Sequence, residues 1–238
     1  MFIERINGTR RLVISDIHGC LKTFQELIGK VAPAKNDQIF ILGDYIDRGP
    51  ASSGVLDFLL QMKSAGFTLY LLKGNHEVNL LNAYSEYDKE TFIFFVRKIN
   101  KSLSLLNQDG DIKKEYYDFF NSLNWYFETD THLIVHAGIN FNCDDPFTDT
   151  VSMVELRHTD IEKAQRFIGN KAVIHGHQVT PIDEITAAVR DRKQVIPLDN
   201  GCYYTKKHKV YDVNTTGNLC CFDLDSYELY LQRNIEVE

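Results

Sequence analysis

Five short polar segments of the 238-residue chain carry side chains that can bind metal ions, and each segment directly follows an apolar run. Carboxylate and amide oxygens and imidazole nitrogens suit Mn, Fe or Zn. A single histidine in a turn is more often a hydrogen-bonded structural residue than a ligand, but five such turns together predict a shared site. The side chains concerned are Asp16, His18, Asp44, Asn75, His76, His136 and His177.

The segment 43–49, Gly-Asp-Tyr-Ile-Asp-Arg-Gly, adds an arginine to the acids. It follows the apolar run 39–42, so it is expected just past the carboxyl end of a buried strand, where open α/β sheets place their sites. Asp44 can bind a cation there, and the guanidinium of Arg48 can hold a phosphate. The alternative is a solvated turn in which Asp47 and Arg48 form a local pair.

The elements that position these turns can be inferred from hydrophobic spacing. Residues 11–15, 39–42 and 67–72 are predicted to be strands, with helices between them. Successive strand–helix–strand units imply parallel strands with right-handed crossovers, so their turns should meet at one edge of a sheet. Further strands at 133–135 and 172–175 end in His136 and at the Gly-His pair 176–177.

Residues 84–131 are expected to form a helical insertion that could line the site or only cover the sheet. The aromatic residues expected to hold it in place are Phe92, Phe95, Tyr117, Phe120 and Trp125. The chain from residue 182 onward, with apolar runs at 195–198, 219–224 and 227–231, predicts antiparallel strands. We therefore expect an α/β (α+β) fold with two packed mixed β-sheets flanked by helices, in a single domain spanning 1–238.

Composition excludes several classes of protein. The sequence has 44% hydrophobic residues, and no apolar run is long enough to span a membrane. Its amino-terminal residues lack the apolar region of a signal peptide, so a cytoplasmic location is expected. A net charge of −7 argues against a broad nucleic-acid surface. Five scattered cysteines without a Cys-x-x-Cys pair indicate free thiols and make a thiolate zinc site improbable.

Taken together, the motifs resemble the phosphoprotein phosphatase family of metallophosphoesterases, and in length the chain resembles its compact bacterial and phage members. Order and approximate spacing fit from residue 15 to residue 178. The matching segments are Asp-Ile-His-Gly at 16–19, Gly-Asp-Tyr-Ile-Asp-Arg-Gly at 43–49, Gly-Asn-His-Glu at 74–77, His-Ala-Gly at 136–138 and Gly-His at 176–177. The resemblance implies a calcineurin-like sandwich of two sheets with a dinuclear metal centre, for which Mn²⁺ is expected and Fe or Zn are alternatives.

The resemblance also assigns roles residue by residue. His76 and Asp47 would form a proton-donating pair, and Arg48 would hold the phosphate. A second phosphate-binding arginine is best matched by Arg157, with Arg166 as the less favoured candidate because it falls in a predicted helix. Asp16 and His18 would bind the first metal, Asp44 would bridge, and the second metal would be bound by Asn75, His136 and His177. Residues 198–202 resemble a late loop of bacterial members, without a role for it or for Tyr203 and Tyr204.

The implied activity is hydrolysis of phosphoserine or phosphothreonine, and also of phosphotyrosine, in proteins or peptides by a metal-bound hydroxide. The alternative is a symmetrical diadenosine tetraphosphate hydrolase or another nucleotide-cleaving relative. That group typically lacks an acid at the position of Asp47 and has Asp in place of Glu77, so these two residues favour the phosphatase. A non-catalytic metal-binding module would be expected to have a damaged ligand or acid, and none is damaged.

Overall fold

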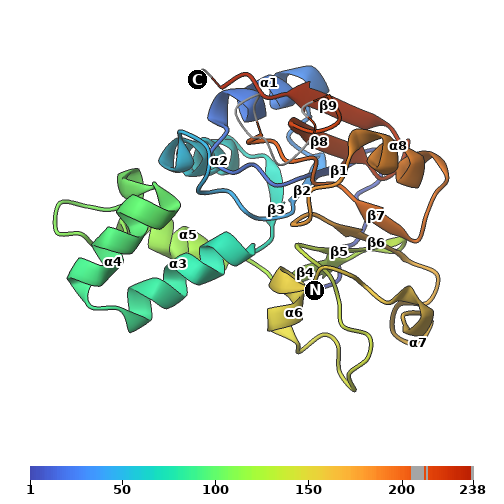
Figure 1. Cartoon of the computed structure of the whole chain (residues 1–238). Helices are drawn as coiled ribbons and strands as arrows, with labels where there is room; N and C mark the ends of the chain where they lie inside the picture. The colour runs from blue at the N-terminus through green and yellow to red at the C-terminus, as the bar shows by residue number, and fades with distance from the viewer. Residues whose placement is uncertain (205–211, 213, 237–238) are drawn as a thin grey trace.

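The structure, a computed structural model that describes residues 1–204, 212 and 214–236, contains two mixed β-sheets flanked by helices (Figure 1). The first sheet has the order β3-β2-β1-β8-β9 and the second the order β4-β5-β6-β7. The first consists of β1 (Arg11–Ile14), β2 (Gln38–Ile41), β3 (Thr68–Leu71), β8 (Asn218–Asp223) and β9 (Leu229–Arg233). The second consists of β4 (Tyr126–Glu128), β5 (His132–Val135), β6 (Ala172–His175) and β7 (Val195–Pro197). The predicted two-sheet architecture is confirmed.

Strands β1, β2 and β3 are parallel and in register, as predicted. Ile14 pairs with Ile41, and Ile41 pairs with Leu71, so the three strands end side by side. In the second sheet, β5 and β6 are also parallel. The turns that follow these five strands therefore start from two aligned sets of strand ends.

The two faces of the first sheet are both buried, which explains why its strands are continuous apolar runs. Successive side chains of a strand point to opposite faces. Val13 and Phe40 point toward the second sheet, where the ring of Phe40 lies 5.8 Å from that of Phe127. Their neighbours Leu12 and Ile39 pack on the other face, against helices α1 (Leu21–Val31) and α2 (Ser52–Ser64).

The outer face of the second sheet is covered by α6 (Thr150–Glu155), a 3₁₀ turn (Ile161–Lys163) and α7 (Gln165–Ile168). The helix predicted around Arg166 is therefore short, and a separate 3₁₀ turn precedes it. Within the described residues, no helix is long and apolar enough to cross a membrane.

The prediction for the chain beyond residue 182 was partly wrong. Residues Ile182–Arg190 form a helix, α8, whose Ile185 and Val189 pack between the sheets. β-branched residues at this spacing favour strands by propensity, but burial of one helical face outweighs that preference here. Strand β7 is parallel to β6, whereas β8 and β9 form the antiparallel pair that was expected.

The helical insertion projects to one side of the sandwich (green in Figure 1). It contains the end of α3 (Asn75–Glu86), α4 (Lys89–Phe95), a π-helical turn (Val96–Asn100), a 3₁₀ turn (Leu103–Leu105) and α5 (Lys114–Ser122). Phe92 and Phe120 are buried, as expected. Tyr117 is 42% exposed, because α5 buries the face formed by Tyr116, Phe119 and Phe120 instead.

We expect Phe40→Ala to destabilise the protein by about 3–5 kcal/mol, because it removes a fully buried ring from between the two sheets and leaves a cavity. Denaturant unfolding would measure the loss. The matched control is Phe94→Ala, whose ring is 60% exposed and whose loss should change stability by less than about 0.5 kcal/mol. Equal effects of the two substitutions would contradict this description of the core.

Candidate metal and phosphate site

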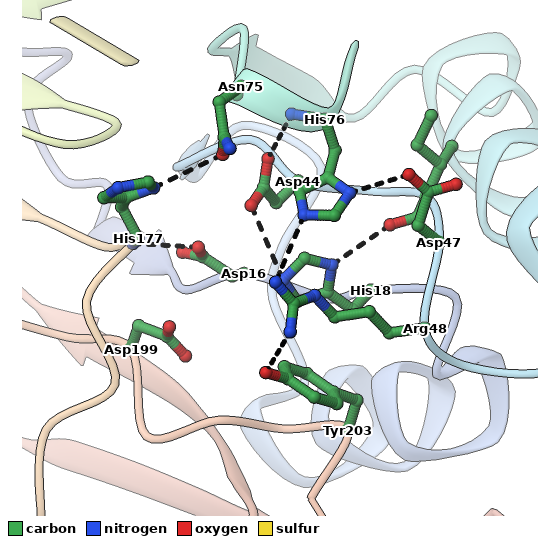
Figure 2. Close-up of polar contacts among 12 residues, drawn as sticks. Asp16, His18, Asp44, Asp47, Arg48, Asn75, His76, His177, Asp199 and Tyr203 are labelled. Carbon is green, nitrogen blue, oxygen red and sulfur yellow. Dashed lines mark hydrogen bonds and ion pairs between the residues drawn. The ribbon is translucent and has the colours of Figure 1, made fainter. Parts of the chain in front are cut away.

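The five polar turns meet at one edge of the sandwich; Figure 2 shows four of them, and the contacts of His136 with Asp44 and Asn75 place the fifth. Turns after β1, β2 and β3 come from the first sheet, and turns after β5 and β6 come from the second. The seam between the sheets therefore runs through the site. The residues brought together are Asp16 and His18 after β1, Asp44 after β2, Asn75 and His76 at the start of α3, His136 after β5 and His177 after β6.

The backbone of these turns is unusual. Five of the site residues have positive φ, between 48° and 69°, a region that residues other than glycine adopt rarely and at a cost in energy. They are His18, Asp44, Asp47, Arg48 and His177. Strain of this kind persists only where surrounding contacts enforce it, and it concentrates at functional sites.

Two glycines allow the carboxylates to approach neighbouring backbone. A Cβ at Gly74 would lie 2.2 Å from an oxygen of Asp44, and a Cβ at Gly176 would lie 1.9 Å from an oxygen of Asp16. Any side chain at either position would displace a carboxylate that the sequence identified as a candidate ligand.

Glu77 holds two of the turns against each other. Its carboxylate accepts hydrogen bonds from the backbone N–H groups of Asp44 (3.0 Å), Tyr45 (2.9 Å) and Gly74 (3.0 Å). Burial and the nearby charge of Asp44 raise the pKa of Glu77 to about 8. The residue is fully buried, so its contribution to the site is to fix the turns rather than to contact a ligand.

Asp44 lies at the centre, between two histidines. His18 Nε2 is 3.5 Å from one of its oxygens and His136 Nε2 is 3.6 Å from the other. Each ring directs Nδ1 to a backbone carbonyl, of Ile46 (3.1 Å) and Leu42 (2.8 Å) respectively, so a neutral ring presents the lone pair of Nε2 to Asp44. Burial lowers the pKa of both histidines, that of His18 to about 3, which keeps the rings neutral.

The amide of Asn75 sits between two ring nitrogens. Its oxygen is 3.2 Å from His136 Nε2 and 3.3 Å from His177 Nδ1. If the amide is turned, its nitrogen can instead donate to both rings and to Asp44. With the oxygen facing inward, lone pairs of Asn75, Asp44 and the two histidines converge without a proton among them, an arrangement that a divalent cation would satisfy.

Asp16 has one satisfied and one orphaned oxygen. Oδ2 accepts a hydrogen bond from the backbone N–H of His177 at 2.9 Å, whereas the buried Oδ1 has no hydrogen-bond partner among the described residues. Burial and the nearby charges of Asp199 and Asp44 raise the pKa of Asp16 well above its usual value. A buried carboxylate oxygen without a donor fits a cation ligand.

The histidine and acidic side chains close enough to bind a common metal ion form two groups, and both groups include Asp44. Asp44 with His18 and His76 makes one, and Asp44 with His136 and His177 makes the other, with the potential ligand atoms of each group within 4.8 Å of one another. The donors are oxygens and imidazoles, and all five cysteines are free thiols. The residues present therefore fit two divalent cations bridged by a carboxylate.

His76 also has a partner on its other side. His76 Nδ1 lies 2.7 Å from Asp47 Oδ2, and the neighbouring Nε2 lies 3.5 Å from Nη2 of Arg48. Burial opposes a charge on His76, but Asp44 and Asp47 outweigh it and raise the pKa of His76 to about 9. The ring is thus held as a proton donor next to a guanidinium.

Arg48 is supported by Tyr203, a residue to which the sequence gave no role. The guanidinium lies over the Tyr203 ring, 4.5 Å from its centroid, and Nη1 donates to the tyrosine hydroxyl (Figure 2). Arg157 lines the same small cavity of about 190 Å³ as Arg48, together with His177 and Tyr203. Arg166 instead lies over the ring of Phe167 and donates to the carbonyl of Phe141, outside that cavity.

Asp199 is a site residue that sequence analysis missed. It lines the small cavity and is buried, and its Oδ1 accepts the N–H of Gly201 at 2.7 Å. Burial raises the pKa of Asp199 to about 7 despite that hydrogen bond. The signal was present, because Asp199 directly follows the apolar run 195–198 just as Asp16 and Asp44 follow theirs.

Residues 9–181 match the family model of the calcineurin-like phosphoesterases. The chain belongs to the calcineurin-like phosphoesterase family. The family uses a dinuclear centre of divalent metal ions, and the oxygen and imidazole donors described above are the candidate ligands for such a centre in this chain.

Curated relatives resemble a limited part of the chain. A symmetrical bis(5'-nucleosyl)-tetraphosphatase from Wigglesworthia glossinidia brevipalpis is 40% identical over 78 residues, which are 32% of this chain and 28% of that protein. A protein of the same description from Proteus mirabilis is 37% identical over 75 residues, 31% of this chain and 26% of that one. The similarity thus spans little more than a quarter of each relative.

Solved structures share the fold over nearly the whole chain. One described as a putative diadenosine tetraphosphatase has a TM-score of 0.60 at 20% identity and covers 97% of this chain and 96% of that one. A Saccharomyces cerevisiae protein serine/threonine phosphatase with similarity to human PP5 has a TM-score of 0.61 at 15% identity, covering 100% and 84%. At these identities the likeness concerns the fold alone.

The buried charges predict a pH dependence of stability. The folded-state pKa values of Glu77, Asp199 and His76 all lie above those of the unfolded chain, so each group loses a stabilising contribution as pH rises to its folded pKa. His18 and His177, whose pKa values are lowered, are still partly protonated near pH 6.5 in the unfolded chain but not in the folded one, and this opposing contribution ends by about pH 7.5. We expect the Tm of EDTA-treated protein to fall by several degrees between pH 6.5 and 8.5. A loss on the order of a few kcal/mol in the free energy of unfolding produces a fall of that size.

Mn²⁺-loaded protein is the control, because bound cations offset the charge of the buried carboxylates next to them and so remove much of this pH-dependent loss. Thermal unfolding at each pH should therefore give a gap between loaded and EDTA-treated protein that widens with pH. A gap that stays constant or narrows would mean that these acids are not coupled to cation binding.

Proposed function

We propose that this chain hydrolyses phosphate monoesters with alkoxide leaving groups, in the first place phosphoserine and phosphothreonine of proteins, with phosphotyrosine as a further substrate. The observation that carries the proposal is the 2.7 Å contact between His76 Nδ1 and Asp47. A serine or threonine alkoxide is a strong base and leaves readily only when protonated. A phosphate group released from an anhydride is stable as an anion and has less need of a proton donor.

Two divalent cations, when bound, supply a hydroxide near neutral pH and polarise the phosphoryl oxygens. Asp16, His18 and the shared Asp44 would hold one of them. Asp44 would hold the other together with Asn75, His136 and His177. We expect both ions to be Mn²⁺. Fe and Zn are alternatives for this set of donors.

The remaining residues bind the phosphate and move one proton. Arg48 and Arg157 face the small cavity and would bind the equatorial phosphoryl oxygens, where charge spreads in the transition state. A phosphate oxygen placed between Arg48 Nη2 and His76 Nε2 would accept from both donors. His76 would give the Nε2 proton to the departing oxygen, while Asp47 stabilises the charged ring through Nδ1.

A larger cavity of about 830 Å³ opens on the side of His76 and gives room for the leaving group. Its wall includes the exposed face of α3 and parts of the helical insertion, notably Asn79, Asn82 and Lys101. It meets the small cavity at Arg48, His76 and two tyrosines. A peptide segment would fit such a space better than a small free monoester, because amide and charged side chains can bind extended backbone.

The second candidate is symmetrical cleavage of dinucleoside tetraphosphates. The curated relatives named above carry that activity in their descriptions, so on sequence similarity this candidate is favoured over a protein phosphatase. The intact proton donor, His76 with Asp47, argues against this second candidate. The cavity beside His76 has the volume to take a nucleotide as well.

Turnover of the Mn²⁺-loaded protein on phosphoserine and phosphothreonine peptides, beside diadenosine tetraphosphate, separates the two candidates. We expect kcat/KM to be higher for the peptides. His76→Asn should lower kcat on the peptides by about 100-fold or more, since general acids contribute that much, while both metal ions stay bound by elemental analysis. Preferential cleavage of the dinucleotide into two ADP molecules would overturn the proposal in favour of the second candidate.

The two arginines provide a matched pair of variants. Arg157→Ala removes a donor from the cavity and should lower kcat/KM on the preferred substrate on the order of 100-fold. Arg166→Ala, which removes the same charge from α7, should leave turnover near the wild-type value. If both variants keep full activity, Arg157 does not bind the phosphate.

A further inference from the structure

The carboxylate of Asp47 is held by two side chains of the helical insertion as well as by His76. Asn100 Nδ2 donates to Oδ2 at 2.6 Å, and Ser102 Oγ donates to Oδ1 at 2.9 Å. Both side chains are buried, at 5% and 2% exposure. They lie 53 and 55 residues beyond Asp47 in the chain, so the contact forms only when the insertion folds back over the site.

These contacts are part of a closed ring of hydrogen bonds. The backbone N–H of Asp47 donates to Ser52 Oγ at 2.9 Å, and Ser52 Oγ lies 2.9 Å from Ser102 Oγ. With Ser102 donating to Asp47, the consistent proton arrangement has Ser52 donating to Ser102. Each hydroxyl then accepts one hydrogen bond and donates one, so the ring fixes both the backbone and the carboxylate of Asp47.

The ring matters because Asp47 occupies a strained position. Its φ of 69° lies in the left-handed region, and its turn must be kept there by surrounding contacts. Two donors on the carboxylate fix its orientation and leave Oδ2 aimed at His76 Nδ1. The orientation of Asp47 in turn fixes the ring of His76, so that Nε2 faces the cavity beside Arg48.

We propose that Asn100 and Ser102 are positioning residues that tune the His76 proton donor through Asp47, so that the helical insertion takes part in leaving-group protonation. This inference rests on the proposed function of His76 as the acid. A different role, in which the two side chains only anchor the insertion, predicts equal losses on every substrate. The two roles therefore differ in how the losses depend on the leaving group.

The test compares Asn100→Ala and Ser102→Ala with the wild type, all as full-length Mn²⁺-loaded protein, on p-nitrophenyl phosphate, phenyl phosphate and a phosphoserine peptide. These leaving groups need a proton to increasing degrees. We expect kcat to fall by roughly 10-fold or more on the peptide, by less on phenyl phosphate and by under about 2-fold on p-nitrophenyl phosphate. Ser102→Thr, which keeps the hydroxyl, should restore peptide turnover.

Asn121→Ala is the matched control. It removes an asparagine of the insertion whose Nδ2 donates to the carbonyl of Tyr117, away from the site, and should leave all three rates unchanged. Metal content and Tm, measured on each variant, check that the site and the fold persist. Losses of equal size on all three substrates, or unchanged rates, would overturn the positioning role.

The two aryl phosphates keep this test separate from the proposed function. If the wild type does not hydrolyse the phosphoserine peptide, the proposed substrate is wrong. The comparison of phenyl with p-nitrophenyl phosphate still decides the inference, because a selective loss on phenyl phosphate supports positioning and a uniform loss refutes it.

Discussion

The three hydrogen bonds to the carboxylate of Glu77 are the constraint on which the site depends. They join the turn after β2 to the turn that begins α3, and they keep Asp44 beside Asn75 and His76. Because the acceptor is buried, its removal would leave three buried N–H groups unpaired. The strained backbone of the Asp44 turn is held in this way.

Around that constraint the protein gathers carboxyl groups where water cannot solvate their charge. Burial raises the pKa values of Asp16, Glu77 and Asp199, while burial keeps His18 and His136 neutral. Such an arrangement is unfavourable by itself and becomes favourable when cations are bound. Arg48 and Arg157 line the cavity at this centre and place positive charge there in a protein of net charge −7.

Much of the fold and the meeting of the polar turns could be predicted because parallel strands in register bring their ends together, so position after a strand carries spatial information. The rest depended on contacts that no local pattern encodes. Tyr203 reaches Arg48 across 155 residues, and Asn100 reaches Asp47 only through the folding of the insertion. Helix α8 was missed because β-branched residues obscured its helical spacing. Asp199 could have been found, since it follows its strand as Asp44 does.

The hydrogen bonds from Asn100 and Ser102 to Asp47 have a consequence for how this architecture can diversify. The helical insertion borders the cavity beside His76 and also holds Asp47, so it cannot be exchanged without affecting the proposed acid. A different segment in its place would have to supply equivalent hydrogen-bond donors to Asp47. Without them, the enzyme would hydrolyse only substrates whose leaving groups depart readily as anions. Under the proposed mechanism, the choice of substrate and the range of leaving groups would therefore change together.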